Sequence, residues 1–376
     1  MKGKVLILTL VALMCASCYV RTGGRKTLTL DDLGLMLDAY PVERGIGDRY
    51  SPCELVICAE DAWVLSAWDV AESCNAFFLS KNKGVDWEIR ASLGSGWSCE
   101  NMLADGGVIY CSARDQGQTG GITDKAGKIF SSVDYGKSWK ELCAFDAEIE
   151  RLLVVGSTIA VQLYTVAEKD GEGSYETDHS ILVSNDLGES WREYAFGDFY
   201  VSSFSNDIIT VAMSGNVEAV LELDPERQEI DTIQTGAKMI TNVVRGDDVI
   251  GLADGGNADY FRITDGVANF CSRIQYEGAF ANHIPTRIYQ CDSVVYTMVA
   301  VPGANSSSRM YASADCCRSW AEVSTESELD RQLDSVWTPE GATWFMAGFK
   351  DRMVSYCVGY KDGRRRDFIK KVTVCH

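Results

Sequence analysis

A short motif, Ser-x-Asp-x-Gly-x-x-Trp, recurs along this chain and restricts it to architectures that repeat a β-hairpin. Two copies match in full. The first copy carries Asn for Asp, and the last carries Cys for Gly. The first three copies begin 52 residues apart. The motif residues are Ser80, Asn82, Gly84 and Trp87; Ser132, Asp134, Gly136 and Trp139; Ser184, Asp186, Gly188 and Trp191; and Ser313, Asp315, Cys317 and Trp320. Self-similarity near this period is typical of propellers and other repeat folds.

Each residue type in the motif suits a tight turn between antiparallel strands. The Asp carboxylate can accept hydrogen bonds from backbone N–H groups of its own loop, and Ser can add another. Gly permits a left-handed backbone, and Trp buries a large ring against a neighbouring strand. The motif resembles the Asp-box, or BNR repeat, of sialidase-like β-propellers. We therefore interpret all four copies as structural turns, with Cys317 placing the turn geometry of the last copy in question.

The boxes belong to a longer repeat of two hairpins per unit. The first hairpins are expected at 55–68, 102–114, 152–164, 202–214, 243–254, 288–301 and 336–349. The second hairpins turn at the four boxes and, elsewhere, at 224–227, 264–266 and 361–363. The sequence thus predicts an all-β fold, a seven-bladed β-propeller with four-stranded antiparallel blades. We expect the propeller over residues 51–376, preceded by a lead-in segment at 18–50. Residues 27–40 fit either a short helix or an extra edge strand that closes the ring.

The N-terminus reads as an export signal over residues 1–17. Lys2 and Lys4 precede the apolar run Val5–Met14, which is too short to span a membrane. Ala16 and Ser17 before Cys18 resemble a bacterial lipobox, so we expect Cys18 to be acylated, with plain secretion as the alternative. The expected location is the cell envelope, lipid-anchored, or else the periplasm or exterior. With a formal charge of −19, nucleic acid is excluded as a partner, and a membrane is expected only through the anchor.

Cysteine content points to the same compartment. Of 14 cysteines, 12 remain once Cys15 and Cys18 are set aside, and an even number in an exported chain favours several disulfides. Cys316 and Cys317 are adjacent and either bridge each other or pair separately. No paired CxxC motifs occur and there are only three His, so we expect no metal site and no cofactor.

Candidate ligand residues come from the rim that, by the resemblance, lies opposite the boxes. Its long loops are 115–126 and 165–179, and long loops on a rigid scaffold often carry function. The ligand-binding candidates are Trp97, Arg114, Asp170, Tyr200, Phe280 and His283. The catalytic candidates are Asp115, Glu168, Tyr276 and Glu277. Exposed aromatic rings beside carboxylates suit stacking on sugars and hydrogen bonding to hydroxyls. The alternative is that these residues have a structural role and cap the core at the rim.

The resemblance raises sialidase activity, which needs three Arg around a carboxylate and a Tyr–Glu pair. The family's Phe/Tyr-Arg-Ile-Pro motif is missing at the start of the first repeat, and Phe261-Arg262-Ile263-Thr264 lies in the fifth repeat without the Pro. The sequence therefore favours a monomeric binding protein for a glycan or a protein partner. A glycoside hydrolase, sialidase-like or otherwise exo-acting, is the alternative, and an envelope assembly or scaffold factor is third.

Overall fold

The computed structural model describes most of the chain between residues 28 and 374. The described ranges are 28–116, 126–168, 175–194, 196, 199–205, 208–213, 219–237, 240–254, 257–274, 284–291, 293–300, 308–323, 343–349, 352–361 and 364–374. Within them the one helical element is a 3₁₀ turn, η1 (Asp31–Leu33). No described helix is long and apolar enough to cross a membrane.

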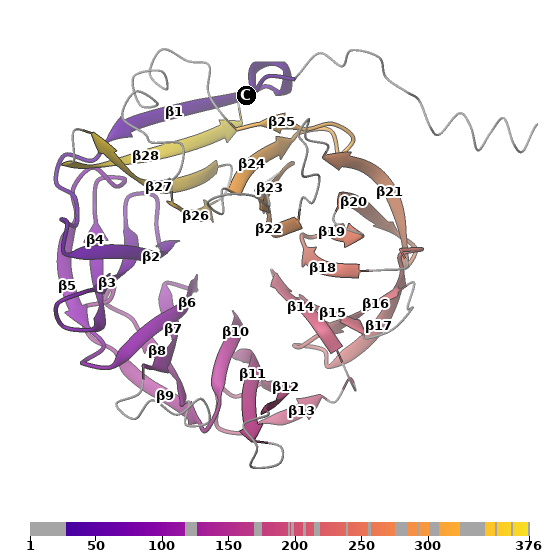
Figure 1. The fold of residues 1–376 in the computed structure, drawn as a ribbon, viewed down its shortest axis with the longest axis horizontal. Coiled ribbons are helices and arrows are strands. Elements are labelled where there is room, and N and C mark those ends of the chain that lie inside the picture. Colours follow the sequence, from indigo (N-terminus) through magenta and orange to yellow (C-terminus); the bar gives the residue numbers. More distant parts are fainter. Residues whose placement is uncertain are drawn as a thin grey trace, which may run out of the picture.

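The strands form antiparallel sheets arranged in a ring around a common axis, as Figure 1 shows. The first sheet contains β2 (Tyr50–Ile57), β3 (Trp63–Asp69), β4 (Cys74–Ser80) and β5 (Glu88–Ser92). The second contains β6 (Trp97–Asp105), β7 (Val108–Asp115), β8 (Gly127–Ser132) and β9 (Lys140–Phe145). The third contains β10 (Glu148–Val155), β11 (Thr158–Glu168), β12 (Tyr175–Ser184) and β13 (Arg192–Tyr194). The first strand of each sheet lies nearest the axis (Figure 1).

The next two groups of four strands are joined into one sheet. One group is β14 (Phe199–Ser205), β15 (Ile208–Met213), β16 (Ala219–Asp224) and β17 (Glu229–Gln234). The other is β18 (Ile240–Arg245), β19 (Val249–Asp254), β20 (Asn257–Thr264) and β21 (Val267–Ile274). Their outer strands meet in a single parallel pair, Gln234 with Val267. Strand pairing in the described residues therefore gives five four-stranded sheets and one eight-stranded sheet, where the sequence predicted seven separate sheets.

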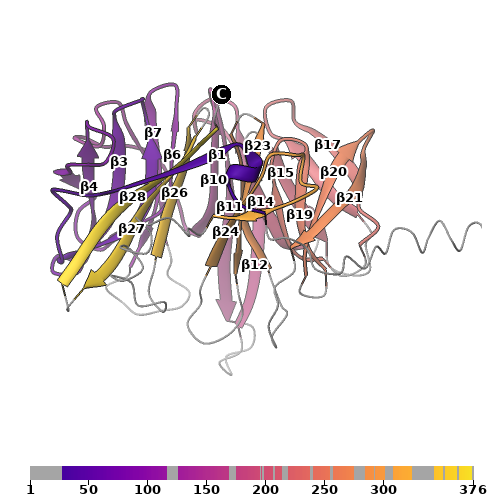
Figure 2. The same ribbon diagram turned by 90° about the horizontal axis from the view of Figure 1, so that it is seen from above.

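The last two sheets complete the ring. One contains β22 (Ile284–Cys291), β23 (Val294–Ala300), β24 (Ser308–Ser313) and β25 (Ala321–Glu322). The other combines the two ends of the chain, in the order β1 (Leu35–Pro41), β28 (Arg364–Val374), β27 (Arg352–Lys361) and β26 (Thr343–Phe349). β1 lies alongside β28 in both Figure 1 and Figure 2, and its register runs from Leu35–Val374 to Pro41–Phe368.

Residues 336–342 of the hairpin expected at 336–349 lie outside the described residues, and the described part pairs differently from the expectation. Residues 343–349 form the inner strand β26, and β26 pairs with β27 rather than with a strand before it. The turn at 361–363 consequently joins the second and third strands of the sheet. Within 27–40, the edge-strand alternative describes residues 35 onward. The propeller arrangement thus includes a strand from the 18–50 segment.

Buried side chains gather between neighbouring groups of four strands rather than in one central core. Seven buried clusters in the described residues each combine side chains from two adjacent groups. One of them lies between β14–β17 and β18–β21 and includes Ala212, Ile250 and Phe261. Strands buried on both faces carry near-continuous apolar runs, which explains sequences such as Trp63–Leu65.

The Asp boxes are the turns between the third and fourth strands, and each attaches its sheet to the preceding one. In the second box, Asp134 Oδ1 accepts hydrogen bonds from the backbone N–H groups of Lys137 and Ser138 at 3.0 and 2.9 Å. Ser132 Oγ accepts one from Gly136 N at 2.9 Å. The four indoles pack on rings of the preceding group, in the pairs Trp87–Tyr356, Trp139–Phe77, Trp191–Phe145 and Trp320–Tyr260.

Cys317 keeps the turn geometry that Gly has in the other boxes. Its φ is 64°, in the left-handed region, and its N–H still bonds Ser313 Oγ at 2.9 Å. The eleven cysteines in the described residues are all in the reduced, unbridged form, so the expected disulfides stay a prediction for the oxidised chain. Cys316 and Cys317, which are adjacent, do not bridge each other.

Candidate ligand site on the axis

Six of the inner strands carry a β-bulge at the same place, near the strand's beginning. The register skips one residue there in β2, β6, β10, β14, β18 and β22. The skipped residues are Cys53, Glu100, Glu150, Tyr200, Thr241 and Thr286. A bulge bends its strand and changes the direction of nearby side chains. The boxes lie at the opposite edge, since Ser80 is level with Trp63 and so with Ile57, at the far end of β2.

A cavity of about 620 Å³ lies on the axis, lined by inner strands from all around the ring. Five residues that directly follow a bulge are polar and line it: Glu54, Asn101, Arg151, Asn242 and Arg287. The other lining residues include Leu55, Leu152 and Ile288, whose side chains are almost fully buried between neighbouring sheets. A second hollow of about 270 Å³ shares Asn101, Arg151 and Arg287 with the first. The two hollows therefore form one site, and we call its end beside the bulges the polar mouth.

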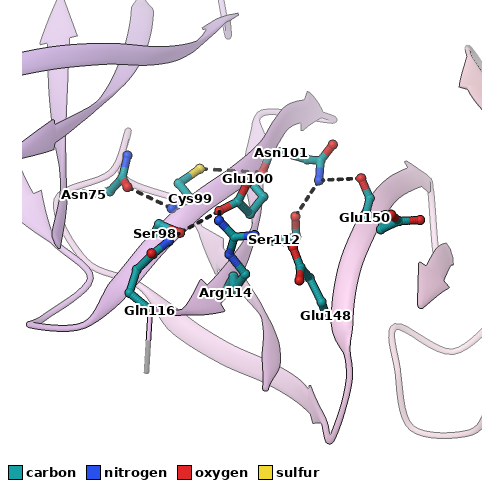
Figure 3. Close-up of polar contacts among 10 residues, drawn as sticks. All are labelled: Asn75, Ser98, Cys99, Glu100, Asn101, Ser112, Arg114, Gln116, Glu148 and Glu150. Carbon is teal, nitrogen blue, oxygen red and sulfur yellow. Dashed lines mark hydrogen bonds and ion pairs between the residues drawn. The ribbon is translucent and has the colours of Figure 1, made fainter. Parts of the chain in front are cut away.

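Arg114 holds two carboxylates at the edge of this mouth (Figure 3). Its Nη1 donates to Glu148 Oε1 at 2.5 Å, and its Nη2 lies 3.2 Å from Glu100 Oε1. Ser98 Oγ also donates to Glu100 at 2.6 Å. Because Glu100 is on β6 and Glu148 is on β10, the guanidinium joins the second and third sheets. Arg114 is thus engaged by protein carboxylates.

The carboxylate of Glu150, the bulge residue of β10, is bound by side chains of the neighbouring strands β11 and β12 in the same sheet. Gln162 Nε2 donates to its Oε2 at 2.6 Å, and His179 Nδ1 lies 3.1 Å from the same oxygen. The ring of His179 also packs on Tyr164, with centroids 5.2 Å apart. The Asn101 amide donates to the Glu150 backbone carbonyl at 3.3 Å, which links the second sheet to the main chain of β10 at its bulge (Figure 3).

Glu54 and Arg287 form an ion pair that passes over the last sheet. Arg287 Nη2 lies 3.3 Å from Glu54 Oε1, and Nη1 lies 3.3 Å from the Tyr289 hydroxyl. β26 lies between the two strands and presents Ala347 and Gly348 to the cavity, so there is room for the long side chain. Burial raises the pKa of the Glu54 carboxyl, although Arg287 opposes this.

Arg151 and Asn242 have polar groups that the protein leaves open to the cavity. Arg151 is exposed, and within the described ranges neither side chain has a hydrogen-bond or ion-pair partner. Arg114 and Arg287 are each paired with Glu, so the described residues contain no three-Arg clamp on the axis. Nor do they contain a group of three or more His, Cys, Asp or Glu side chains suited to a metal ion.

Of the residues predicted from sequence, the structure brings Trp97, Arg114 and Asp115 together at the edge of the second sheet. Trp97 pairs with Asp115, and Trp97 is half-buried, with Lys128 Nζ 4.8 Å from its ring centroid. Glu168 ends β11, opposite Tyr175. Tyr200 is the bulge residue of β14. Asp170, Tyr276, Glu277, Phe280 and His283 lie outside the described residues.

Sequence reasoning missed the residues around the axis. Glu54, Asn101, Arg151, Asn242 and Arg287 each stand just before an apolar stretch in an inner strand. Alignment of the first strands of the repeats would have placed these polar residues in one column. These residues lie in strands, whereas the sequence prediction rested on long loops.

Neither a protein-family model, including any for the Asp box, nor a curated protein matches this sequence. Among solved structures, a protein of unknown function from Dyadobacter fermentans is 12% identical, with a TM-score of 0.50 over 91% of this chain and 99% of that one. An α-L-arabinofuranosidase of Fusarium graminearum, solved with arabinobiose, is 10% identical at a TM-score of 0.46 over 89% and 98%. Sqt1 of Saccharomyces cerevisiae is 8% identical at 0.43 over 92% and 99%. At 12% identity, the similarity to the Dyadobacter protein supports a shared fold and nothing about function. We draw no conclusion from the other two structures, because their TM-scores are below 0.5. The chain has an all-β propeller arrangement of four-stranded units.

Proposed function

We propose that this protein is an exported, lipid-anchored, seven-bladed Asp-box propeller that binds the end of a glycan chain in its axial cavity. The count of seven treats the eight-stranded sheet as two blades. Its halves share only one residue pair, and a separate buried cluster fills the space between them, as between every other pair of neighbours.

The observation that carries the glycan proposal is the ring of polar residues behind the bulges. A sugar hydroxyl both donates and accepts hydrogen bonds, and this mouth offers carboxylates beside guanidinium and amide donors. Arg151 and Asn242 provide donors that no described side chain uses. A volume of about 620 Å³ falls within the usual range for small-ligand sites.

A glycan array followed by calorimetry on the best ligand tests this. Removing a charged hydrogen-bond donor costs about 1.5–3 kcal/mol, so Arg151→Ala should weaken binding roughly 10- to 100-fold. Asn242→Ala should weaken it by about tenfold. Arg227→Ala is the matched control, because Arg227 pairs with Asp224 in the turn at the other edge and should bind normally. Equal binding by all variants would refute the axial site, and a silent array would favour a protein partner.

Glycoside hydrolysis is the second candidate, and Glu54 is the observation that favours it. A carboxyl whose pKa is raised by burial can stay protonated and donate a proton to a glycosidic oxygen. Release of reducing ends from a sialoside, plant and mucin glycan panel would test this. An enzyme should lose most of its rate in Glu54→Gln, with Glu60→Gln as the control, because Glu60 lies between β2 and β3 at the opposite, box edge. An assembly or scaffold role is the third candidate and predicts envelope partners in crosslinking instead.

The anchor is tested separately. Residues 1–27 lie outside the described part, but Leu28 forms a bridge with Ala321, beside the box of β24–β25. We expect Cys18→Ala to move the protein from the membrane fraction to the soluble extracytoplasmic fraction. An unchanged distribution would contradict the anchor without affecting ligand binding.

A further inference from the structure

Two thiols lie against each other in the core between the first and second sheets. Cys99 is on β6 and Cys111 is on the neighbouring strand β7, and their sulfur atoms are 3.0 Å apart. Cys99 pairs with Ala113, two residues from Cys111, so both side chains point to the same face of the sheet. They are 5% and 0% exposed. The two sulfurs are therefore in van der Waals contact within one hairpin.

We infer that Cys99 and Cys111 form a disulfide bond when the chain folds in an oxidising compartment. The sulfurs need to approach by about 1 Å to reach the usual bond length. One thiol, as thiolate, attacks an external low-molecular-weight or protein disulfide, and the second thiol displaces that partner. The pair loses two protons and two electrons, and the external disulfide becomes two thiols. This inference rests on the proposed export for its setting, although the chemistry can be tested without it.

The timing follows from burial. The Cys111 thiol and burial both raise the pKa of Cys99, so little thiolate is available once the sheets have packed. The bond therefore forms while the β6–β7 hairpin is still open to solvent. That hairpin is local, and its turn residues Gly106 and Gly107 adopt the positive φ that glycine favours. Oxidation can thus precede docking of the first sheet.

Cys53 is the competing partner. It occupies the bulge of β2 on the neighbouring sheet. Burial raises the pKa of the Cys53 thiol, and the nearby Cys99 raises it further. Its thiol contacts the Ser51 carbonyl at 3.5 Å instead of another sulfur. A Cys53–Cys99 bond would join two sheets, whereas a Cys99–Cys111 bond stays within one hairpin. The two connectivities differ in which peptides they link.

The sequence provides a direct readout. Trypsin cuts after Arg90 and Arg114, and residues 91–114 contain Cys99 and Cys111 but no other cysteine. We would reduce and unfold the full chain, refold it in a glutathione redox buffer, block free thiols, digest, and measure masses. The expected product is peptide 91–114 lighter by two hydrogens and free of the blocking group. Two blocked thiols in that peptide, or its linkage to residues 50–81, would overturn the inference.

If the chain refolds poorly, the melting temperature of protein that was never unfolded provides a second test of the disulfide. Protein secreted by an expression host should melt several degrees lower after reduction, because the bond restricts the unfolded hairpin. The variant Cys99→Ser/Cys111→Ser should melt near the reduced wild type and respond less to reductant. Cys143→Ser, which removes a thiol from β9, should keep the wild-type response. A double variant whose response to reductant equals that of the wild type would contradict the bond. Neither result depends on glycan binding, so the two proposals fail independently.

Discussion

The first Asp box differs from the other three at two residues, and the differences compensate each other. In the full boxes a Ser hydroxyl donates to the outer Asp oxygen, as Ser138 does to Asp134 Oδ2 at 2.7 Å. In the first box Asn82 Nδ2 donates instead to Asp86 Oδ2 at 2.8 Å. Donor and acceptor have exchanged places while the hydrogen bond remains. The first box with Asn82 therefore keeps the hydrogen bond that the motif has in the other boxes.

This exchange predicts strong coupling between the two positions. Asn82→Asp alone would place two carboxylates in contact and should destabilise the fold by about 1–2 kcal/mol. Adding Asp86→Ser recreates the arrangement of the other boxes and should recover most of that loss. A double-mutant cycle measured by urea unfolding gives the coupling energy. Additive effects of the two substitutions would show that the side chains do not depend on each other.

The second box should also contribute to acid sensitivity. Hydrogen bonds from Ser138, Ser132 and Lys137 lower the pKa of Asp134 to about 2, from an ordinary 3.8. A lowered folded-state pKa means that the carboxylate stabilises the protein above pH 3.8 and loses this effect as pH falls toward 2. The difference in urea midpoint between wild type and Asp134→Asn should therefore shrink across that window. A difference that stays constant from pH 7 to pH 2 would contradict this assignment.

At the scale of elements, the boxes matter because they seat one sheet on the next. A Cβ on Gly84 would lie 2.7 Å from Ile369 of β28 and 2.9 Å from Trp63, and the residue has φ +85°. A left-handed alanine costs roughly 1–2 kcal/mol and overpacking adds about 1–3, so Gly84→Ala should cost about 2–5 kcal/mol. Gly106 also has positive φ, but a Cβ there would meet nothing within 4 Å, so Gly106→Ala should cost only about 1–2 kcal/mol of stability. Equal losses would mean that contact between the sheets is not the cause.

The hairpins could be read from the sequence because each depends on local chemistry. Apolar runs separated by Asp, Asn or Gly turns mark strands such as β6 and β7 wherever the turn lies. The strand order of the last sheet could not be predicted, because its outer strand is β1, more than 300 residues away in the sequence. No local sequence pattern indicates such pairing. The axial residues escaped for a similar reason. Glu54 and Arg287 meet only after the ring has closed.

For the whole molecule, closure of the ring is the property that matters most. β1 and β28 pair over seven residues, and the chain then crosses to the first sheet, where Trp87 N donates to the Arg44 carbonyl at 2.8 Å. Without β1, the long strand β28 would expose its edge and the first and last sheets would lose a covalent link. Exposed strand edges favour aggregation. The axial site would suffer as well, because the Arg287–Glu54 pair spans this closure.

A circular permutant separates strand pairing from chain connectivity. Leu35 pairs with Val374, so the end of β28 and the start of β1 lie side by side, and a short turn could join them directly. New termini at Arg44 and Gly45 would then leave every sheet built from consecutive strands. We expect this permutant to unfold at a midpoint close to that of the wild type and to retain ligand binding. A truncated chain that begins at Gly45 lacks β1 and should unfold earlier or aggregate. If the truncated chain matched the permutant in stability, β1 would be dispensable and the ring would be closed by contacts between the first and last sheets alone.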